Sequence, residues 1–287
     1  MTEARIAVIG GSGLYEIEGM ASIEEVKPQT PFGEPSDAII IGEIEGNRIA
    51  FLPRHGRGHY VSPTELPVRA NIYALKSLGV ECIISVSAVG SLQEEIHPLD
   101  LVVPDQLIDR TKSRVNTFFG GGLVAHVAFA EPFCPVLSDI LYQAAVETGA
   151  GVHKGGTYVV MEGPLFSTKA ESNLYRSWGA SVVGMTALPE AKLAREAEIC
   201  YATVACATDY DCWHEAEESV TIEMVIANLQ KNVGRAKSII KTAISRIPQT
   251  RECGCGEALK DAIITAPDKI PEKTKRELAL LVGKYIE

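Results

Sequence analysis

Residues 199–207 read Ile-Cys-Tyr-Ala-Thr-Val-Ala-Cys-Ala, a run in which every residue except Thr203 is apolar or small. The run shows no alternation between apolar and polar residues, which is typical of a strand buried on both faces of a parallel sheet. Such a strand needs helices on both sides of the sheet. The run therefore favours an α/β fold.

The same strand ends in four residues that suit a binding site: Thr208, Asp209, Tyr210 and Asp211. In open α/β sheets, ligands bind just beyond the carboxyl ends of the strands. Two carboxylates at i and i+2 on extended chain also point the same way. A polar turn in which Asp209 caps the next helix is the alternative, but a turn needs only one Asp. Asp209 and Asp211 are therefore candidate site residues.

Size and charge limit the possible functions. The chain has 287 residues, of which 46% are hydrophobic, enough for one large α/β domain or two small ones. No run approaches the ~18 apolar residues of a transmembrane helix, and we expect no signal peptide. Lys and Arg number 27 against 37 Asp and Glu, a net charge of −10. We therefore expect neither a nucleic-acid polymer nor a membrane as a partner, and any bound anion needs a local basic pocket.

Strands and helices alternate along the chain. Strand-like segments lie at 4–9, 38–43, 48–52, 82–86, 101–104, 157–161 and 181–184, and helical patterns lie at 67–79, 136–148 and 219–245, with another helix starting at Pro189. This order predicts one catalytic α/β domain over residues 1–247 with a central, mostly parallel sheet. A linker at 248–256 and two predicted helices, at 257–264 and 272–285, form a helical C-terminal extension over 248–287.

Three other strand ends carry residues that could bind an anion. The first strand runs into Gly10-Gly11-Ser12-Gly13, where backbone N–H groups and the Ser12 hydroxyl could hold one, although a tight turn explains the glycines almost as well. The segment 54–59, Arg-His-Gly-Arg-Gly-His, places four potential cations in six residues with glycines that allow close approach to phosphate. Ser87 follows the strand at 82–86, and the sequence leaves open whether it binds an anion or caps a turn.

The seven cysteines are odd in number and lie mostly in apolar segments, which indicates buried, reduced thiols and a cytoplasmic location. Cys253-Gly254-Cys255 is the exception. A lone C-x-C lacks the second pair of ligands that a zinc site needs. We therefore favour a structural or redox role for this pair and assign no metal.

Taken together and in order, these motifs resemble the family of trimeric purine nucleoside and 5′-methylthioadenosine phosphorylases, from Ile6 to at least Leu229. The matching segments are Gly10-Gly11-Ser12-Gly13-Leu14, Arg54-His55-Gly56-Arg57, Glu131-Pro132-Phe133-Cys134-Pro135, Glu162-Gly163-Pro164-Leu165-Phe166-Ser167, Met185-Thr186 and Ala207-Thr208-Asp209-Tyr210-Asp211-Cys212-Trp213. The resemblance implies a three-layer αβα fold with a mixed sheet and a homotrimer or dimer of trimers. It also implies that inorganic phosphate is a co-substrate and that no cofactor is needed.

The resemblance further implies a reaction, the phosphorolysis of 5′-methylthioadenosine to adenine and 5-methylthioribose 1-phosphate in methionine and purine salvage. Phosphate would be held by Ser12, Arg54, His55, Ser87, Ala88 and Thr186. The nucleoside would contact Phe166, Met185, Thr208, Ile222, Val225, Ile226 and, from a neighbouring subunit, His126. Asp209 would donate a proton to purine N7, for which its pKa must rise above the ~3.9 of a free Asp.

Substrate preference follows from the same residues. Asp209 and Asp211 together favour the 6-amino group of adenine over a 6-oxo group, and the apolar Ile222 favours a methylthio group over a 5′-hydroxyl. Ser at positions 12 and 87, where many relatives have Thr, keeps the hydroxyl that phosphate needs. In heat-stable relatives such C-x-C pairs form disulfides, which leaves the pairing of Cys253 and Cys255 open.

Three alternatives remain. The first is a 6-oxopurine nucleoside or 5′-methylthioinosine phosphorylase, with the same fold and a different base. The second is a hydrolase that cleaves the same bond with water, against which the phosphate loop at Arg54 and His55 argues. The third is a non-catalytic nucleotide-binding or dinucleotide-dependent protein. Glu16 occupies the third glycine position of the dinucleotide fingerprint, which counts against a dinucleotide.

Overall fold

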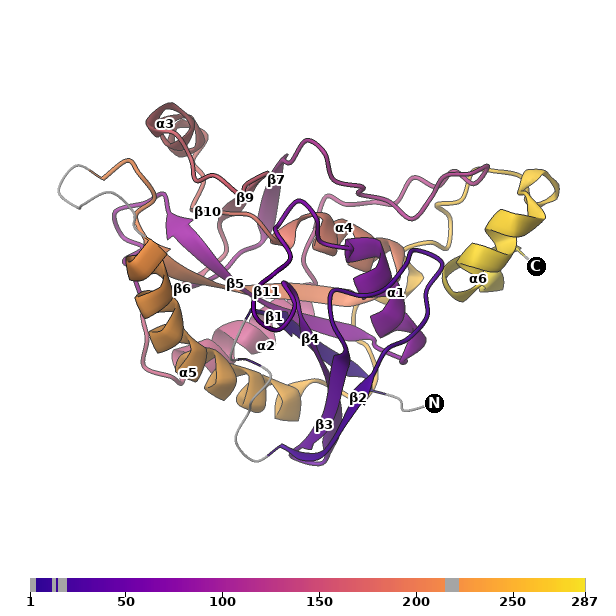
Figure 1. Ribbon diagram of the computed structural model, residues 1–287, viewed down its shortest axis with the longest axis horizontal. Helices are drawn as coiled ribbons and strands as arrows, with labels where there is room; N and C mark the ends of the chain where they lie inside the picture. Colours follow the sequence, from indigo (N-terminus) through magenta and orange to yellow (C-terminus); the bar gives the residue numbers. More distant parts are fainter. Residues whose placement is uncertain (1–3, 12–13, 15–19, 215–221, 287) are drawn as a thin grey trace.

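A computed structural model of the chain describes residues 4–11, 14, 20–214 and 222–286, without the side chains of residues 222, 224, 225 and 229. The described residues form one eleven-stranded mixed sheet with helices on both faces (Figure 1), which confirms the αβα prediction. The strands are β1 (Ile6–Gly10), β2 (Ala21–Val26), β3 (Ile39–Ile44), β4 (Asn47–Pro53), β5 (Cys82–Ser91), β6 (Leu101–Val103), β7 (Gln106–Arg110), β8 (Val152–Lys154), β9 (Thr157–Met161), β10 (Val182–Gly184) and β11 (Cys200–Asp209). The helices are α1 (Val68–Ser77), α2 (Pro135–Val146), α3 (Lys169–Ser177), α4 (Ala187–Glu196), α5 (Ile222–Arg246) and α6 (Glu272–Ile286), with short 3₁₀ turns η1 (Gly254–Glu257) and η2 (Pro267–Lys269).

Strand β5 is the centre of the sheet. It pairs in parallel with β1 on one side and β11 on the other, and its last residues pair antiparallel with β10. Strand β4 pairs in parallel with β1. The carboxyl ends of β4, β1, β5 and β11 therefore meet at one edge of the sheet, which is where α/β proteins bind ligands.

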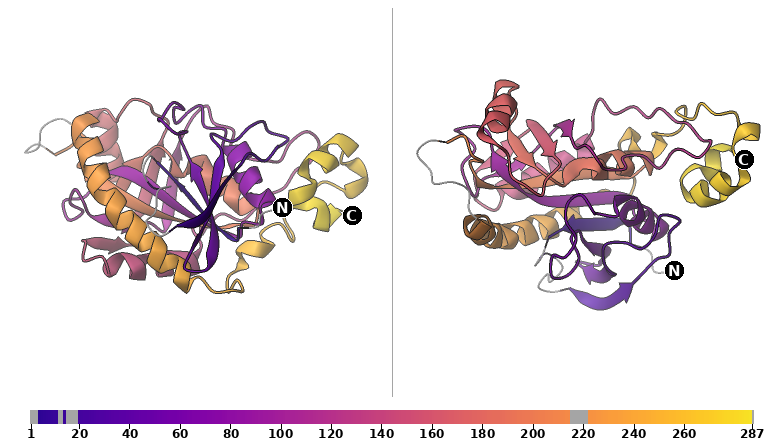
Figure 2. Two further views of the ribbon diagram at one scale, coloured as in Figure 1. Left: turned by 60° about the horizontal axis from the view of Figure 1, so that its bottom comes forward. Right: turned by 45° about the horizontal axis from the view of Figure 1, so that its top comes forward.

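Strand β11 is buried on both faces, as its unbroken apolar run predicts. Its even-numbered residues, such as Ala202 and Val204, pack into a core with α2 and α5. Odd-numbered residues, such as Tyr201 and Ala207, pack into a second core with α1, α4 and α6. Figure 2 shows the long helix α5 lying along one face of the sheet. Because β11 packs against a hydrophobic core on each face, packing fixes the position of its polar end.

The strand predicted at 82–86 is longer in the structure. β5 continues through Ser87 and Ala88 to Gly90 and Ser91, where it pairs with β10, so Ser87 does not cap a turn. The predicted helix at 257–264 is absent, since the chain there ends the 3₁₀ turn η1 and continues in turns through Ala262. Pairing with the loop at 124–126 replaces the helix, because Ile263 forms a β-bridge with Ala125.

The C-terminal extension packs on the second core through buried apolar residues, among them Leu259, Leu278 and Val282. Helices α6 and α3 lie at opposite ends of the molecule in Figures 1 and 2. The division of the chain at residue 248 stays a prediction. Among the helices of the described residues, none has the length and apolar character to cross a membrane.

Candidate active site

Asp209 is the last residue of β11, and its carboxylate is 6% exposed. Oδ2 accepts a hydrogen bond from the Thr208 hydroxyl at 2.7 Å, and Oδ1 accepts one from the backbone N–H of Asp211 at 2.8 Å. A Cβ atom at Gly90 of β5 would lie 3.0 Å from Asp209 Oδ1, so glycine is needed there for close approach. The side chain is therefore fixed against the neighbouring strand.

Asp211 lies close to Asp209, but not for the reason that the spacing suggests. The strand ends at Asp209, and Asp211 takes a left-handed conformation with φ of 52°. A turn therefore brings the two residues together, and strand alternation does not. Burial raises the pKa of the Asp211 carboxyl, although the nearby hydroxyls of Ser172 and Ser167 partly oppose this effect.

Arg54 follows β4 and is 2% exposed. Its Nε donates to Glu190 Oε1 at 2.5 Å, and its Nη2 donates to Glu190 Oε2 at 3.1 Å and to Ser85 Oγ at 2.8 Å. Nη1 donates to the carbonyl of Val86 at 2.9 Å. Glu190 neutralises the guanidinium, and these bonds use four of its five N–H groups, so Arg54 can offer an anion one further N–H of Nη1.

His55 lies next to Arg54 and is neutral near pH 7. Burial, reinforced by the charge of Arg54, lowers the pKa of His55 to about 4. Its Nδ1 is 2.8 Å from the carbonyl of Val61, and because a carbonyl only accepts, Nδ1 carries the proton. The other ring nitrogen, Nε2, is therefore an acceptor.

The hydroxyls of Ser87 and Thr186 lie 2.9 Å apart, although 99 residues separate them in the chain. Ser87 comes from β5, and Thr186 is the N-cap residue of α4. Beside both lies the fully buried Tyr158 hydroxyl, whose pKa burial raises. Ala88 is the next residue of β5. The structure thus brings together Arg54, Ser87, Ala88 and Thr186 from three separate segments.

The second arginine of the basic loop turns away from this cluster. Arg57 forms ion pairs with Glu25 and Asp37 at the surface. Gly56 has φ of 72°, and a Cβ atom there would lie 2.2 Å from the Tyr60 ring, so this glycine serves the turn. The four potential cations therefore do not form one anion-binding island.

Arg114 organises the segment that carries Met185, and sequence reasoning did not find it. Its guanidinium donates to the carbonyls of Met185, Leu188 and Glu162. Met185 packs against Gly163, where a Cβ atom would lie 2.5 Å from the Met185 sulfur. One buried arginine therefore fixes the loop after β9 and the turn before α4 relative to each other.

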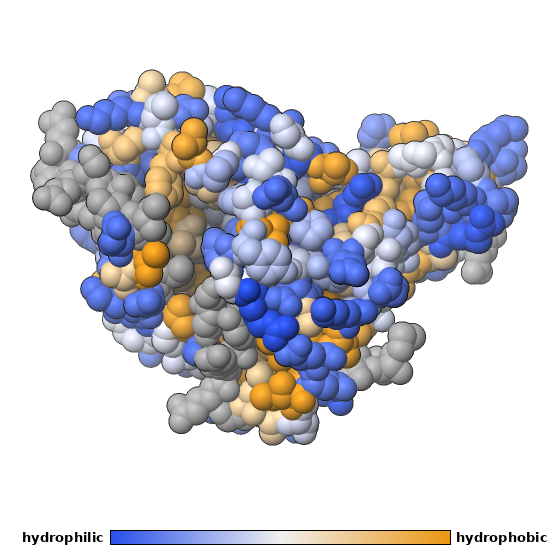
Figure 3. Space-filling model, in the orientation of Figure 1, coloured by the Kyte–Doolittle hydropathy of each residue, from blue (hydrophilic) through white to orange (hydrophobic). Residues whose placement is uncertain are grey.

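Exposed apolar side chains border this edge of the sheet. On the face seen in Figure 3, orange side chains lie between α3 and the first turns of α5. Exposed large apolar residues include Leu165 and Phe166, in the loop before α3, and Ile226 of α5. Phe166 is 49% exposed and Ile226 is 48% exposed. A cavity of about 520 Å³ opens beside Cys212 and Trp213, directly after Asp211. This cavity borders the chain just after the aspartates, and none of the candidate site residues that the structure describes lines it.

Helix α5 is tied to the end of β11. Asn228 donates to the carbonyl of Thr208 at 2.8 Å, and Asn232 donates to that of Ala207 at 3.4 Å. These bonds hold the first turns of α5, which begin at Ile222, beside the aspartates. The side chains of Ile222 and Val225 lie outside the described part of the chain, as does Ser12.

His126 lies away from the other candidates within its own chain. It is exposed, and its backbone N–H donates to the carbonyl of Ala262 in the C-terminal extension at 2.9 Å. That extension ends in α6, at the end of the molecule opposite α3 (Figure 1). The structure therefore does not bring His126 to Asp209 of the same chain.

The register of β5 and β11 sets the distance between the hydroxyl pair at Ser87 and the carboxylate of Asp209. Asp209 pairs with Gly90, and Ser87 lies three residues earlier on β5. Three residues of extended strand span roughly 10 Å. The site thus has hydroxyl and guanidinium donors at one end and two carboxylates at the other. A site of this class can hold a small anion and a hydrogen-bonding ligand side by side.

Comparison with known proteins identifies the family. A model of the phosphorylase superfamily matches residues 5–245, and the chain belongs to this superfamily. Among its relatives is the S-methyl-5′-thioadenosine phosphorylase of Geobacter sulfurreducens, 59% identical over 99% of this chain and 100% of that one. The protein of the same name from Koribacter versatilis is 56% identical over 99% of this chain and 97% of its own.

Solved structures agree. A methylthioadenosine phosphorylase sourced from an antarctic soil metagenomic library has a TM-score of 0.94 at 51% identity, over 98% of this chain and 99% of that one. A methylthioadenosine phosphorylase from Schistosoma mansoni in complex with adenine has a TM-score of 0.80 at 35% identity, over 98% of both chains. The family expected from the sequence motifs is confirmed.

Sequence reasoning missed three buried residues of the site: Glu190 and Arg114, which hold its segments in place, and Tyr158, which lies beside Ser87 and Thr186. Glu190 left a usable signal, because it follows Pro189 in an otherwise apolar stretch directly after Met185-Thr186. A charged residue in such a stretch needs a buried partner. Arg114 and Tyr158 lie among ordinary loop and strand residues, and no local pattern marks them.

Proposed function

We propose that this protein catalyses the phosphorolysis of 5′-methylthioadenosine, as a pentosyltransferase. One observation carries the proposal: the Ser87–Thr186 hydroxyl pair with Arg54 lies roughly 10 Å along β5 from the Asp209 carboxylate. A purine nucleoside with phosphate beneath C1′ has comparable dimensions. The relatives that bear the name methylthioadenosine phosphorylase and match almost the whole chain support the same substrate.

In the proposed reaction a phosphate oxygen forms a bond to C1′ while the bond from C1′ to purine N9 breaks. The electron pair of that bond passes to the purine, and N7 takes a proton. Positive charge develops on the ribose, so a phosphate held beneath the sugar stabilises the transition state. The products are adenine and 5-methylthioribose 1-phosphate.

Phosphate is assigned to Ser12, Arg54, His55, Ser87, Ala88 and Thr186. Arg54 and the two hydroxyls donate hydrogen bonds to its oxygens. Neutral His55, with the proton on Nδ1, accepts a hydrogen bond through Nε2 from the P–OH group of hydrogen phosphate. Because Glu190 already balances Arg54, phosphate selection rests on donor geometry and needs no net positive charge.

Asp209 is assigned as the proton donor to N7. Its burial at the end of β11 and its place beside Asp211 support this assignment. Asp211 is assigned to the 6-amino group. A 6-oxo group there would place two acceptors together, and an unpaired buried polar group costs ~1–3 kcal/mol.

The remaining contacts set the fit of the nucleoside. Phe166 covers the purine face, Met185 lies against the ribose, and Thr208 completes the strand end. The first turns of α5 give an apolar wall to the 5′-methylthio group, with Ile222, Val225 and Ile226 as its residues. The tie from Asn228 to Thr208 supports this placement, because it holds these turns beside the base.

A homotrimer, alone or as a dimer of trimers, would explain how His126 can contact a nucleoside although it lies far from the site of its own chain. The residue is exposed and distant from its own site, so it is available to a neighbouring subunit's site. We further propose that the protein works in the cytoplasm, on a nucleoside and phosphate, with no cofactor and no nucleic-acid partner. Seven unpaired cysteines support a reducing compartment, and a net charge of −10 disfavours polyanions.

Substrate comparison tests this assignment. With saturating phosphate, kcat/KM should be at least ~5-fold higher for 5′-methylthioadenosine than for 5′-methylthioinosine, because an unpaired buried polar contact costs ~1–3 kcal/mol. It should also exceed kcat/KM for adenosine. A preference for the inosine compound would replace the proposal with the 6-oxopurine alternative.

A further inference from the structure

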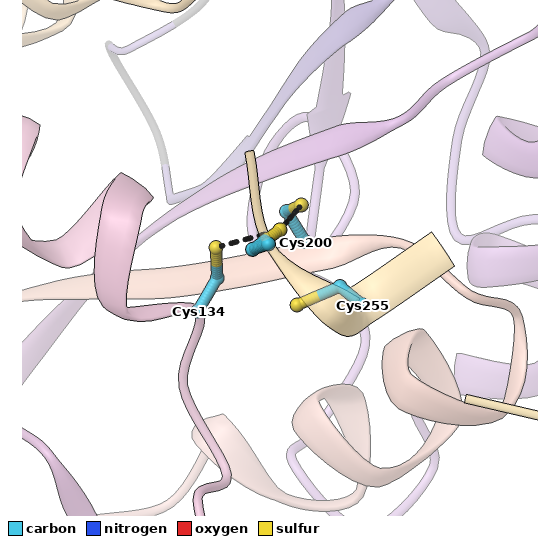
Figure 4. A group of neighbouring side chains, drawn as sticks. Cys134, Cys200 and Cys255 are labelled. Atoms are coloured by element: carbon cyan, nitrogen blue, oxygen red, sulfur yellow. Dashed lines mark hydrogen bonds between the residues drawn. The ribbon is translucent and has the colours of Figure 1, made fainter. Parts of the chain in front are cut away.

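Four cysteines that are far apart in the sequence meet at the amino-terminal end of β11. They are Cys134, Cys200, Cys253 and Cys255, and their sulfur atoms all lie within 4.8 Å of one another. Figure 4 shows the labelled members pointing their sulfur atoms into the same space. Cys134 and Cys200 thus supply the second ligand pair that the Cys253-x-Cys255 motif lacks in the sequence.

The spacing of the sulfur atoms suits a tetrahedral metal ion. The Sγ atoms of Cys200 and Cys253 are 3.3 Å apart, and those of Cys134 and Cys253 are 3.6 Å apart. A zinc ion with bonds of ~2.3 Å to four thiolates sets the sulfur atoms about 3.8 Å apart. A disulfide would instead need ~2.05 Å. All seven cysteines are unpaired in the structure.

The surroundings of the cluster also fit a small ion. A cavity of about 20 Å³ is bordered by Cys134, Cys200 and Cys253. This is room for one ion or one water molecule and excludes an organic ligand. Three of the four cysteines are buried, and Cys253 is partly buried. Such a set of four protein ligands leaves no open coordination position, as in structural zinc sites.

The backbone holds two of the ligands in place, and an arginine lies nearby. Cys134 is the N-cap residue of the twelve-residue helix α2, and its own N–H donates to the carbonyl of Tyr201, one residue beyond Cys200. Arg251 borders the same cavity and supplies positive charge.

We propose that Cys134, Cys200, Cys253 and Cys255 bind one structural zinc ion as four thiolates. Soft sulfur ligands in tetrahedral arrangement select zinc over the oxygen-seeking cations. The ion links the linker after α5 to α2 and β11, and so fastens the C-terminal extension to the catalytic domain. It takes no part in catalysis, because the nine residues from Cys200 to Asp209 span roughly 30 Å of strand.

Metal analysis of the full-length protein tests the proposal. The protein is expressed with added zinc, purified under a thiol reductant, and its metals are measured by inductively coupled plasma mass spectrometry. We expect about one zinc ion per chain. Replacement by Co²⁺ should give the visible bands of a tetrahedral cobalt thiolate, which report the ligand set independently of any variant.

Two variants complete the test. The double variant C253S/C255S should lose the zinc, whereas Cys206→Ala should keep it, because Cys206 is buried further along β11 and outside the cluster. Chelation should lower the thermal midpoint of the wild type by several degrees and leave that of the double variant unchanged. Metal-free wild type, bound iron, full zinc in the double variant, or a disulfide among the four cysteines despite reductant would each overturn the proposal.

Discussion

Arg54 Nε and Glu190 Oε1 lie 2.5 Å apart, and both side chains are almost completely removed from solvent. Arg54 follows β4 and Glu190 lies in α4, so this ion pair joins the two segments that flank the proposed phosphate site. Burial of a single unpaired charge is costly. The phosphate donors therefore keep their positions only while both partners are present.

Removing one partner should destabilise the fold. Glu190→Ala leaves the Arg54 guanidinium buried without a counter-charge, a loss of ~3–5 kcal/mol in the free energy of unfolding. Glu190→Gln keeps one acceptor for Arg54 and should lose less. Urea unfolding followed by circular dichroism measures both. Wild-type stability in the Glu190→Ala variant would show that the pair is not needed to hold Arg54.

Glu196 in the same helix is the matched control for Glu190. Its carboxylate accepts hydrogen bonds from Thr117 Oγ1 and the Phe118 N–H, and no arginine among the described residues pairs with it. Burial raises the pKa of Glu196 to about 7, so the folded state holds a proton that the unfolded state releases above its ordinary value of 4.5. The stabilisation of the fold that depends on protonated Glu196 is therefore fully present below pH 4.5 and is lost as the pH rises through 7. Glu196→Gln should therefore stabilise the protein at pH 8, by at most ~3 kcal/mol, and have little effect at pH 4. Equal effects at both pH values would contradict this assignment.

His55 titrates in the opposite sense. Its pKa in the folded state, about 4, is below the ordinary value of 6.5. The stability that depends on neutral His55 is thus present above 6.5 and lost as pH falls through 4, by up to ~3 kcal/mol. His55→Asn, whose amide can still donate to the Val61 carbonyl, should lose less stability than wild type between pH 7 and pH 4. Parallel unfolding curves for the two proteins over this range would refute the prediction.

Substitution of Asp209 should mainly lower the rate, whereas substitution of Asp211 should mainly change the preference for the purine base. Asp209→Ala removes the proposed proton donor and should lower kcat by ~10²–10⁴-fold, more than Asp211→Ala does. Asp211→Asn should narrow the difference in kcat/KM between 5′-methylthioadenosine and 5′-methylthioinosine. Circular dichroism checks that each variant is folded. Wild-type turnover by Asp209→Ala would remove Asp209 from its role.

The sequence predicted features that depend on one segment and missed those that depend on two. The unbroken apolar run before Asp209 was enough to predict a doubly buried strand, because burial on both faces leaves no polar positions. The proximity of Asp209 and Asp211 was predicted, but its cause was wrong, since a left-handed residue is not visible in the spacing. The strand at 82–86 was predicted too short, because its last residues, Gly90 and Ser91, pair with β10 about 90 residues away in the sequence.

The residues that support the site could not be predicted for the same reason. Glu190 meets Arg54 across 136 residues of sequence. The predicted helix at 257–264 failed because Ile263 pairs with Ala125, a tertiary contact that overrides local propensity. The C-x-C motif gave half of a ligand set, and only the fold brought Cys134 and Cys200 to it.

Phosphate dependence tests the central claim most directly. Purified protein is incubated with 5′-methylthioadenosine, with and without inorganic phosphate, and adenine and the sugar product are followed by chromatography. We predict adenine release only with phosphate, matched mole for mole by 5-methylthioribose 1-phosphate. Equal release without phosphate, yielding the free sugar, would indicate a hydrolase, and an intact nucleoside at every phosphate concentration would contradict the proposed function altogether.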